Sequence, residues 1–182
     1  MTTPPQRPTV SIRFSAAEIA ARVDVMAEEL AAQLPADTLV VSVLKGSFVF
    51  AADLIRALSR AGADWSMDFL TLSSYGTGTQ TTGSVKVVRD IVDDVRGRDV
   101  LLVDDILESG YTLSFAKNML KERGAHRVWV CTLLDKPHKR RTGLKPDFTG
   151  FEAGDEFVVG YGLDWAHRFR GLPYIGVVEK TG

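Results

Sequence analysis

Three short apolar runs limit the folds open to this chain more than any other feature. The runs at 38–44 (TLVVSVL), 99–105 (DVLLVDD) and 127–134 (RVWVCTLL) are continuous rather than alternating, which is typical of strands buried on both faces. Segments 46–62 and 112–123, which lie between them, have helical character and each ends at a glycine. This alternation predicts an α/β fold with a mainly parallel, twisted sheet and helices on both of its faces.

Further elements follow from local patterns. Ser15 and Glu18 have the spacing of a capping box, and apolar residues then recur at helical spacing as far as Leu34, so a helix is predicted there. Four more strands are expected, at 64–73, 84–91, 156–162 and 172–179. The first two are predicted to be the arms of a long hairpin.

The chain is predicted to form a single domain over residues 1–182, because it shows no internal repeat and no linker that would divide it. Residues 1–9 are rich in proline and threonine and are expected to be a flexible tail. Residues 74–83 (SYGTGTQTTG) contain only turn-forming and hydroxyl-rich types, which predicts a mobile loop at the tip of the hairpin.

The bulk composition excludes several classes of function. The net charge is -1, so no excess of positive charge favours binding to nucleic acid or to an anionic membrane. The apolar runs are far shorter than the ~20 residues of a membrane span, and the first ten residues lack the apolar core of a signal peptide. The single cysteine, Cys131, cannot form an internal disulfide, and we expect a reducing, cytoplasmic location.

Chemistry is concentrated at residues 100–113 (VLLVDDILESGYTL). Asp104 and Asp105 end an apolar strand, and two carboxylates at such an edge are costly unless they meet a metal, hydroxyls or cations. The residues after them could turn backbone N–H groups toward an anion at a helix N-terminus, with hydroxyl donors at Ser109 and Thr112. Acids for a sugar diol or Mg²⁺ beside a phosphate cradle suit a ribose 5-phosphate.

Other interpretations of this motif remain open at the level of the residues alone. An acidic strand end also fits a nucleotide-binding strand or the metal pocket of a receiver domain. A P-loop would need the run G-x-x-x-x-G-K-[ST], which does not occur. A dinucleotide fold would need G-x-G-x-x-G, and the nearest run, at 76–78, lacks the third glycine and the helix.

The motif resembles the 5-phosphoribosyl 1-pyrophosphate motif of type I phosphoribosyltransferases, in which two acids precede an acid, Ser or Thr, Gly and Thr. Four other segments resemble parts of the hypoxanthine-guanine branch, in the same order along the chain. They are the pyrophosphate loop at 43–50, the flexible active-site loop at 73–83, the purine-contacting lysine segment at 133–137 and the purine hood at 144–176. The resemblance runs from about Val40 to Gly176.

The resemblance implies a role for each matching residue. Ribose hydroxyls and Mg²⁺ would meet Asp104 and Asp105. The 5′-phosphate would be held around Glu108, Ser109, Gly110, Tyr111 and Thr112. The pyrophosphate would contact Leu44, Lys45, Gly46 and Arg170, with a cis peptide before Lys45. Ser74 and Tyr75 would belong to the flexible loop. The purine side would comprise Lys136, Phe157, Val158 and Asp164, and Asp164 would hold a second Mg²⁺.

Glu108 is the residue to which the resemblance assigns the catalytic role, as the base that takes a proton from N7 of the purine. The family usually has Asp at this position and Glu at position 104, so the chain departs from it twice. Glutamate keeps the carboxylate but adds about 1.5 Å of reach, which the local backbone must accommodate.

Structural explanations of the same residues compete with these roles. Glu108 could be a charge favoured at a helix start, and Ser109 or Thr112 could cap the helix. Lys45 could lie in solvent at an ordinary strand-to-helix turn. Lys136 could be one more member of the basic run at 136–141, and Phe157 could be a core aromatic.

The activity implied by the resemblance is transfer of phosphoribosyl from 5-phosphoribosyl 1-pyrophosphate to hypoxanthine or guanine, giving the nucleoside monophosphate and pyrophosphate with Mg²⁺. The expected partners are these small molecules, with no nucleic acid or membrane, and the resemblance implies a homodimer or homotetramer. Two alternatives are a xanthine-preferring enzyme for 6-oxopurines and a non-catalytic nucleotide sensor of the same fold.

Overall fold

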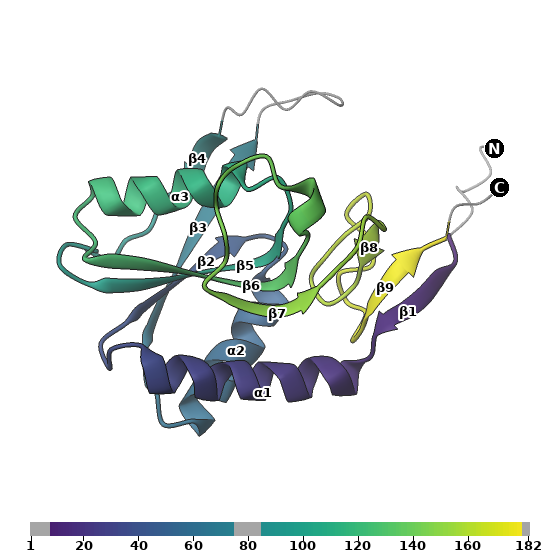
Figure 1. Cartoon of the computed structure of the whole chain (residues 1–182), viewed down its shortest axis with the longest axis horizontal. Coiled ribbons are helices and arrows are strands. Elements are labelled where there is room, and N and C mark those ends of the chain that lie inside the picture. The colour runs from purple at the N-terminus through teal and green to yellow at the C-terminus, as the bar shows by residue number, and fades with distance from the viewer. Residues whose placement is uncertain (1–7, 75–84, 180–182) are drawn as a thin grey trace.

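The structure is a computed structural model that describes residues 8–74 and 85–179. Its main sheet has six strands in the order β4-β3-β2-β5-β6-β7 (Figure 1). In chain order their bounds are β2 (Leu39–Leu44), β3 (Ser66–Ser74), β4 (Val85–Arg89), β5 (Asp99–Leu107), β6 (Arg127–Asp135) and β7 (Phe148–Glu152). All neighbours pair in parallel except β3 and β4, so the predicted mainly parallel sheet is confirmed.

Helices cover both faces of this sheet, as the alternation of apolar runs predicts. Figure 1 shows α3 on one face and α1 and α2 on the other. Their bounds are α1 (Ala16–Gln33), α2 (Phe48–Arg60) and α3 (Tyr111–Glu122), and a short 3₁₀ helix, η1 (Pro137–Lys139), follows β6. β5 lies inside the sheet and is covered on both faces, which explains why its apolar run is continuous. Its Leu101 and Val103 join the core under α1 and α2, whereas Val100 and Leu102 join the core under α3.

The start of α1 confirms the predicted capping box. The Ser15 N–H donates to Glu18 Oε2 at 2.8 Å, and the Glu18 N–H donates to Ser15 Oγ at 3.3 Å. These two bonds satisfy backbone donors that the first helical turn leaves free. The helix then buries the stripe that its spacing predicts, namely Ile19, Val23, Met26, Ala27 and Leu30.

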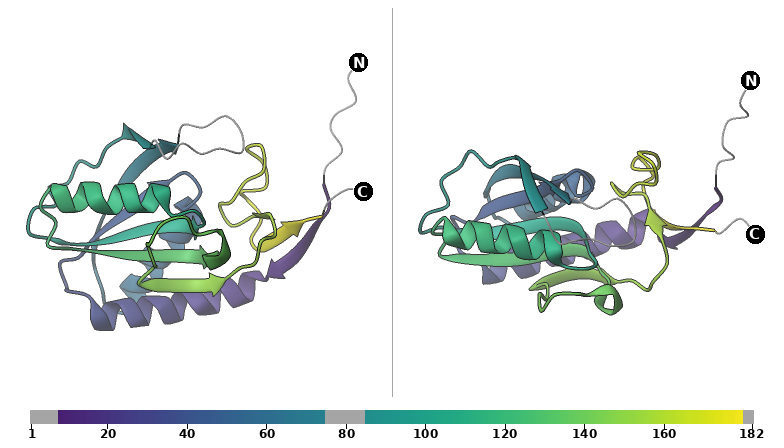
Figure 2. Two further views of the ribbon diagram at one scale, coloured as in Figure 1. Left: turned by 45° about the horizontal axis from the view of Figure 1, so that its top comes forward. Right: turned by 90° about the horizontal axis from the view of Figure 1, so that it is seen from above.

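A second, three-stranded antiparallel sheet joins segments from the two ends of the described chain. Its order is β1-β9-β8, with bounds β1 (Val10–Phe14), β8 (Val158–Val159) and β9 (Ile175–Val178). The purine hood was expected at 144–176; we use the word hood alone for residues 10–14 and 153–178, which exclude β7. Figure 2 shows the hood beyond one end of the main sheet in both views, at the edge where the parallel strands finish.

Three details of the strands differ from the sequence predictions. β5 runs to Leu107, two residues beyond Asp105, because its pairing with β6 continues after its pairing with β2 has stopped at Val103. β1 was not predicted, and three of its five residues are exposed. β7 lies in the stretch expected to be a basic loop and hood, yet it extends the main sheet.

The hairpin of β3 and β4 is confirmed by their antiparallel pairing. Its tip, residues 75–84, lies outside the described residues, and so do most of the expected tail at 1–9 and the final residues 180–182. Within the described chain, no helix combines the length and apolar character that a bilayer crossing requires.

Candidate active site

Two adjoining cavities open where the parallel strands finish. The larger, of about 440 Å³, lies between the ends of β2, β3 and β5 and the hood, and we call it the edge cavity. The smaller, of about 260 Å³, surrounds the turn from β5 into α3, and we call it the turn cavity. They share Asp105, Ile106 and Glu108, so they form one continuous site. Ligands of open α/β sheets bind at this edge.

Asp104 and Asp105 are both buried at the floor of this site, with 8% of each residue exposed. They are neighbours on the chain, and the Asp105 N–H donates to Asp104 Oδ1 at 2.9 Å. Burial raises the pKa of the Asp104 carboxyl well above its usual range, and the adjacent Asp105 raises it further. Burial also raises the pKa of Asp105. A cation or a diol that binds here would relieve this cost.

The loop after β2 packs directly on Asp105. The peptide bond between Leu44 and Lys45 is cis, as the resemblance implies. A Cβ added to Gly46 would lie 1.8 Å from Asp105 Oδ2, so only glycine leaves room for the carboxylate. Leu44, Lys45 and Gly46 thereby line the edge cavity beside Asp105.

The hood reaches the same loop from the other side. A Cβ on Gly162 would lie 2.1 Å from the Gly46 carbonyl oxygen, and Gly162 has a left-handed φ of 99°. The neighbouring Tyr161 is buried, and its hydroxyl donates to Asp53 Oδ2 of α2 at 2.6 Å. These contacts fix the position of the hood relative to the main sheet.

The turn into α3 presents backbone donors to the turn cavity. Gly110 is the residue that caps the helix, with a left-handed φ of 88°, and having no side chain it makes no capping bond itself. Ser109 and Thr112 line the cavity, and Ser109 Oγ also accepts from the Tyr111 N–H at 3.5 Å, so Ser109 combines a cavity position with a weak capping contact. A Cβ on Gly110 would lie 2.2 Å from Thr142 Oγ1. Free N–H groups at a helix start bind anions such as phosphate.

Glu108 and Lys136 meet inside the edge cavity. Lys136 Nζ lies 2.8 Å from Glu108 Oε1, and it also donates to the Glu156 carbonyl oxygen at 2.8 Å. The two partners differ sharply in exposure, because 2% of the Lys136 side chain is exposed against 42% of the Glu108 side chain. Lys139 Nζ lies 3.6 Å from the same Oε1. The cavity therefore offers a buried cationic donor beside an anionic acceptor.

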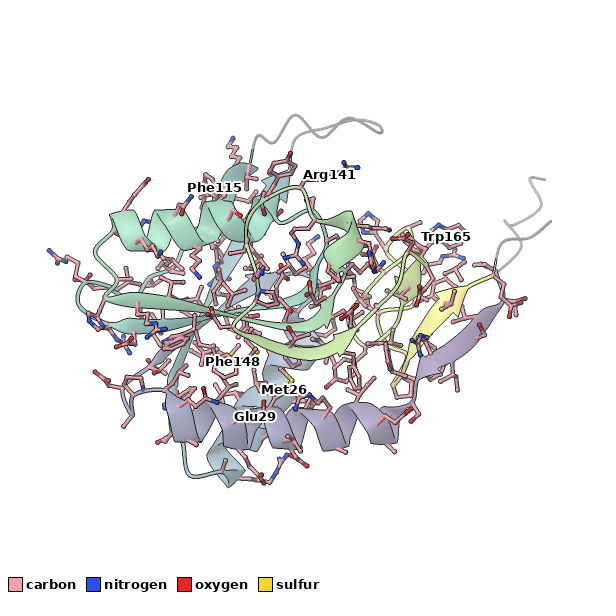
Figure 3. All side chains as sticks on the ribbon, in the orientation of Figure 1. Met26, Glu29, Phe115, Arg141, Phe148 and Trp165 are labelled. Carbon is pink, nitrogen blue, oxygen red and sulfur yellow. The ribbon has the colours of Figure 1, made fainter. Side chains whose placement is uncertain are left out.

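The hood contributes an aromatic ring and an ion pair. Phe157 lines the cavity and is 52% exposed, so the alternative that it is a core aromatic is wrong. Val158 beside it is buried. Arg170 Nη2 lies 2.7 Å from Asp164 Oδ1, and Arg170 Nη1 donates to the Gly162 carbonyl oxygen at 2.7 Å. Figure 3 labels the exposed Trp165 on the hood.

The structure thus brings most of the predicted residues to one site, and three need comment. Tyr111 begins α3 beside the turn cavity but does not line it. Ser74 ends β3 and pairs with Val85, and its backbone position is all that is described. Tyr75 lies outside the described residues.

Arg140 is a site residue that sequence reasoning missed. It lies in the loop between η1 and β7, and its guanidinium contacts the backbone of the β5–α3 turn. In the sequence it is one of several cations between Lys136 and Arg141, and nothing in that run distinguishes it from its neighbours. Its role depends on how two distant segments pack, which no local pattern indicates.

The residues fit a Mg²⁺ that is shared with a substrate rather than a metal centre made by protein alone. Among the described residues, no three His, Cys, Asp or Glu side chains gather closely enough to hold a metal. Mg²⁺ commonly binds one or two carboxylates together with substrate phosphates and water. Asp104 and Asp105 supply such hard oxygen donors, and burial raises the pKa of both carboxyls. Asp164, which lies 2.7 Å from Arg170, is a further carboxylate that lines the edge cavity.

Comparisons with known proteins agree with this geometry. A hypoxanthine phosphoribosyltransferase of Escherichia coli K12 is 44% identical over 173 residues, which cover 93% of this chain and 96% of that protein. A hypoxanthine-guanine phosphoribosyltransferase of Bacillus subtilis 168 is 44% identical, with 93% of each chain covered.

Solved structures are equally similar. A hypoxanthine-guanine phosphoribosyltransferase from Bacillus anthracis, with a HEPES molecule in its active site, superimposes with a TM-score of 0.88. It is 40% identical, and the match covers 95% of this chain and all of that one. The phosphoribosyl transferase domain model matches residues 15–165 of this chain. This chain is therefore a member of the phosphoribosyl transferase family.

Proposed function

We propose that the protein transfers the phosphoribosyl group of 5-phosphoribosyl 1-pyrophosphate to hypoxanthine or guanine, and so acts in purine salvage. The products are the nucleoside monophosphate and pyrophosphate. The observation that carries the proposal is the 2.8 Å separation of Lys136 Nζ and Glu108 Oε1 inside the edge cavity. The activity named for the relatives supports the same reaction.

The Lys136–Glu108 pair matches one edge of a 6-oxopurine. Such a base carries an acceptor oxygen on C6 and, in one tautomer, an N–H at the adjacent N7. The Lys136 ammonium donates to the oxygen, and the Glu108 carboxylate accepts from the N–H. Adenine places an amino group on C6, which would set two donors against each other, so adenine is rejected. The exposed ring of Phe157 is available to stack on the base.

The other substrate occupies the turn cavity and the adjacent floor. The backbone N–H groups at the start of α3, with Ser109 and Thr112, hold the 5′-phosphate. Asp104 and Asp105 face the ribose hydroxyls. Leu44, Lys45 and Gly46 line the place of the pyrophosphate, with Arg170 opposite.

Mg²⁺, when bound, would offset charge on the pyrophosphate as it leaves, with Asp104 and Asp105, and Asp164 at a second position, as its protein ligands. The chain's own residues perform the remaining tasks. N9 of the purine forms a bond to C1′ of the ribose, and the bond from C1′ to pyrophosphate breaks with its electron pair on the leaving oxygen. Glu108 takes the proton from N7, which leaves the product purine neutral.

Turnover assays with five bases test this proposal. Hypoxanthine, guanine, xanthine, adenine and uracil are each supplied with 5-phosphoribosyl 1-pyrophosphate and Mg²⁺, and the nucleotide product is measured. Hypoxanthine or guanine should give the highest kcat/KM, and adenine and uracil should give no product. A preference for xanthine would replace the proposed specificity. Nucleotide binding without turnover of any base would show a sensor and overturn the proposal.

The organisation of the protein is part of the same proposal. The chain acts as one domain over residues 1–182, with 144–176 as the purine hood, although β7 within that range belongs to the main sheet. It works in the cytoplasm as a homodimer or homotetramer. The mass in solution, measured by light scattering, tests the assembly, and a monomer at micromolar concentration would refute it.

A further inference from the structure

The Arg140 guanidinium is hydrogen-bonded on every side to backbone or carboxylate oxygens. Its Nε donates to the Glu108 carbonyl oxygen at 2.9 Å, and Nη2 donates to the Leu107 carbonyl oxygen at 3.3 Å. Its Nη1 donates to the Leu144 carbonyl oxygen at 2.5 Å, and Nη2 also contacts Asp135 Oδ1. Only 12% of the side chain is exposed, so these bonds are shielded from water.

These bonds join the peptide of Glu108 to a segment that lies far away in the sequence. The loop after β6 supports the same turn through its backbone, because the Lys136 N–H donates to the Leu107 carbonyl oxygen at 3.0 Å and the Arg141 N–H donates to that of Ser109 at 2.9 Å. The carbonyl of Glu108 itself is held by Arg140 alone among these three residues. The guanidinium therefore fixes the point from which the Glu108 side chain extends.

That anchor matters because the Glu108 side chain is long and half exposed. A carboxylate at the end of three rotatable bonds reaches a given atom only if its backbone is held still. Lysine could replace one of the Arg140 bonds but not the planar set, because only a guanidinium presents several N–H groups in fixed directions. A base that is misplaced by about 1 Å can lose about a hundredfold in rate.

We propose that Arg140 is a positioning residue for Glu108. It sets the reach of the carboxylate to the purine without touching a substrate. The inference rests on the proposed function, because it assigns Arg140 a part in proton transfer only if Glu108 is the base. It predicts that loss of the guanidinium lowers kcat and leaves the KM for 5-phosphoribosyl 1-pyrophosphate nearly unchanged.

The test is a double-mutant cycle between position 140 and position 108. Arg140→Lys and Arg140→Met are each made in the wild-type chain and in the Glu108→Gln variant, and kcat is measured with both substrates saturating. Arg141→Met is the matched control, because Arg141, labelled in Figure 3, is an exposed cation on the same loop. We expect kcat to fall about tenfold to a hundredfold in wild type and less than twofold in Glu108→Gln.

Each outcome bears on the proposal. An equal fall of kcat in the wild-type and Glu108→Gln backgrounds would show that Arg140 supports the fold in general. That result would overturn the proposal. A fall of the same size in Arg141→Met would overturn it as well. If Arg140→Met does not fold, Arg140→Lys and Asp135→Asn, which loosens the guanidinium from the other side, carry the same comparison. Absence of turnover in the wild-type chain would instead refute the proposed function, so the two failures are distinguishable.

Discussion

The two halves of the site are built in different ways. The turn cavity comes from one continuous stretch, in which Asp104 to Thr112 form the floor, the turn and the helix start. The edge cavity is assembled from β2, β3, β5, Lys136 just after β6 and the hood, which are far apart along the chain. Backbone N–H groups dominate the first half, whereas side chains dominate the second. If the proposed function holds, recognition of the 5′-phosphate is a property of local structure, and recognition of the base is a property of packing.

Removal of Mg²⁺ should have the largest effect, because it acts on the substrate that both halves share. With excess chelator we expect turnover to fall below detection, and it should return when Mg²⁺ is added. Asp164→Asn should raise the Mg²⁺ concentration needed for half-maximal rate. These results are measured by titration of Mg²⁺ at saturating substrates. Undiminished turnover in chelator would remove the metal from the proposed function.

Glu108→Gln should give the next largest effect, because it removes the proposed base. The amide keeps the shape and one acceptor oxygen but cannot take the N7 proton, so kcat should fall by about 10²–10⁴-fold. Binding of both substrates, measured by calorimetry, should persist. Full activity in this variant, with chemistry shown to limit the rate, would mean that another group accepts the proton.

Glu108→Asp provides the matched control for geometry. The reference pKa values of the two acids, about 3.9 and about 4.3, are too close to explain a large change in rate. If the turn held by Arg140 suits the longer side chain, the aspartate variant should also lose activity, although it restores the residue usual in the family. A variant as fast as wild type would show that reach is not set by the backbone.

Lys136→Ala should separate the two halves most directly. A charge-assisted hydrogen bond in a closed site contributes roughly 1.5–3 kcal/mol, so the affinity for the purine should fall about tenfold to a hundredfold. The affinity for 5-phosphoribosyl 1-pyrophosphate should change little, because Lys136 does not line the turn cavity. An equal loss for both substrates would contradict the division into halves.

Gly110→Ala tests the turn cavity, as Lys136→Ala tests the edge cavity, and should have the smallest effect on activity. The added Cβ meets Thr142 Oγ1 and the residue must keep a left-handed φ, which costs about 1–3 kcal/mol. We expect the KM for 5-phosphoribosyl 1-pyrophosphate to rise about tenfold, while the preference among purines stays the same. A change in that preference would show that the turn also orients the base.

The same division explains how much of the molecule could be predicted from its sequence. The residues of the turn cavity follow one another, so their chemistry is visible as a motif and their place at a strand end follows from the apolar run. The sheet and its helices were predictable for the same reason, because each depends on local periodicity. Lys136, Phe157 and Asp164 were identified only through the resemblance to a family.

What could not be predicted depends on contacts between distant segments. β1 is a short strand whose partner, β9, lies at the far end of the chain. β7 contains Gly150, which weakens any strand signal, but a Cβ there would lie 2.5 Å from the Leu133 carbonyl oxygen. In the sequence Arg140 cannot be distinguished from its basic neighbours, and only the fold brings its guanidinium to the Glu108 carbonyl oxygen.

The contact of Gly162 with Gly46, and of Gly46 with Asp105, has a consequence for anyone who redesigns the protein for another base. Three segments touch there with no room for a Cβ at residue 46 or at residue 162, so each limits what the others can become. A new loop in the hood would need a matching change at residue 46. A screen of single substitutions would discard each change, because either one alone disturbs the contact. Recombination of whole segments is therefore a better route to altered specificity than stepwise mutation.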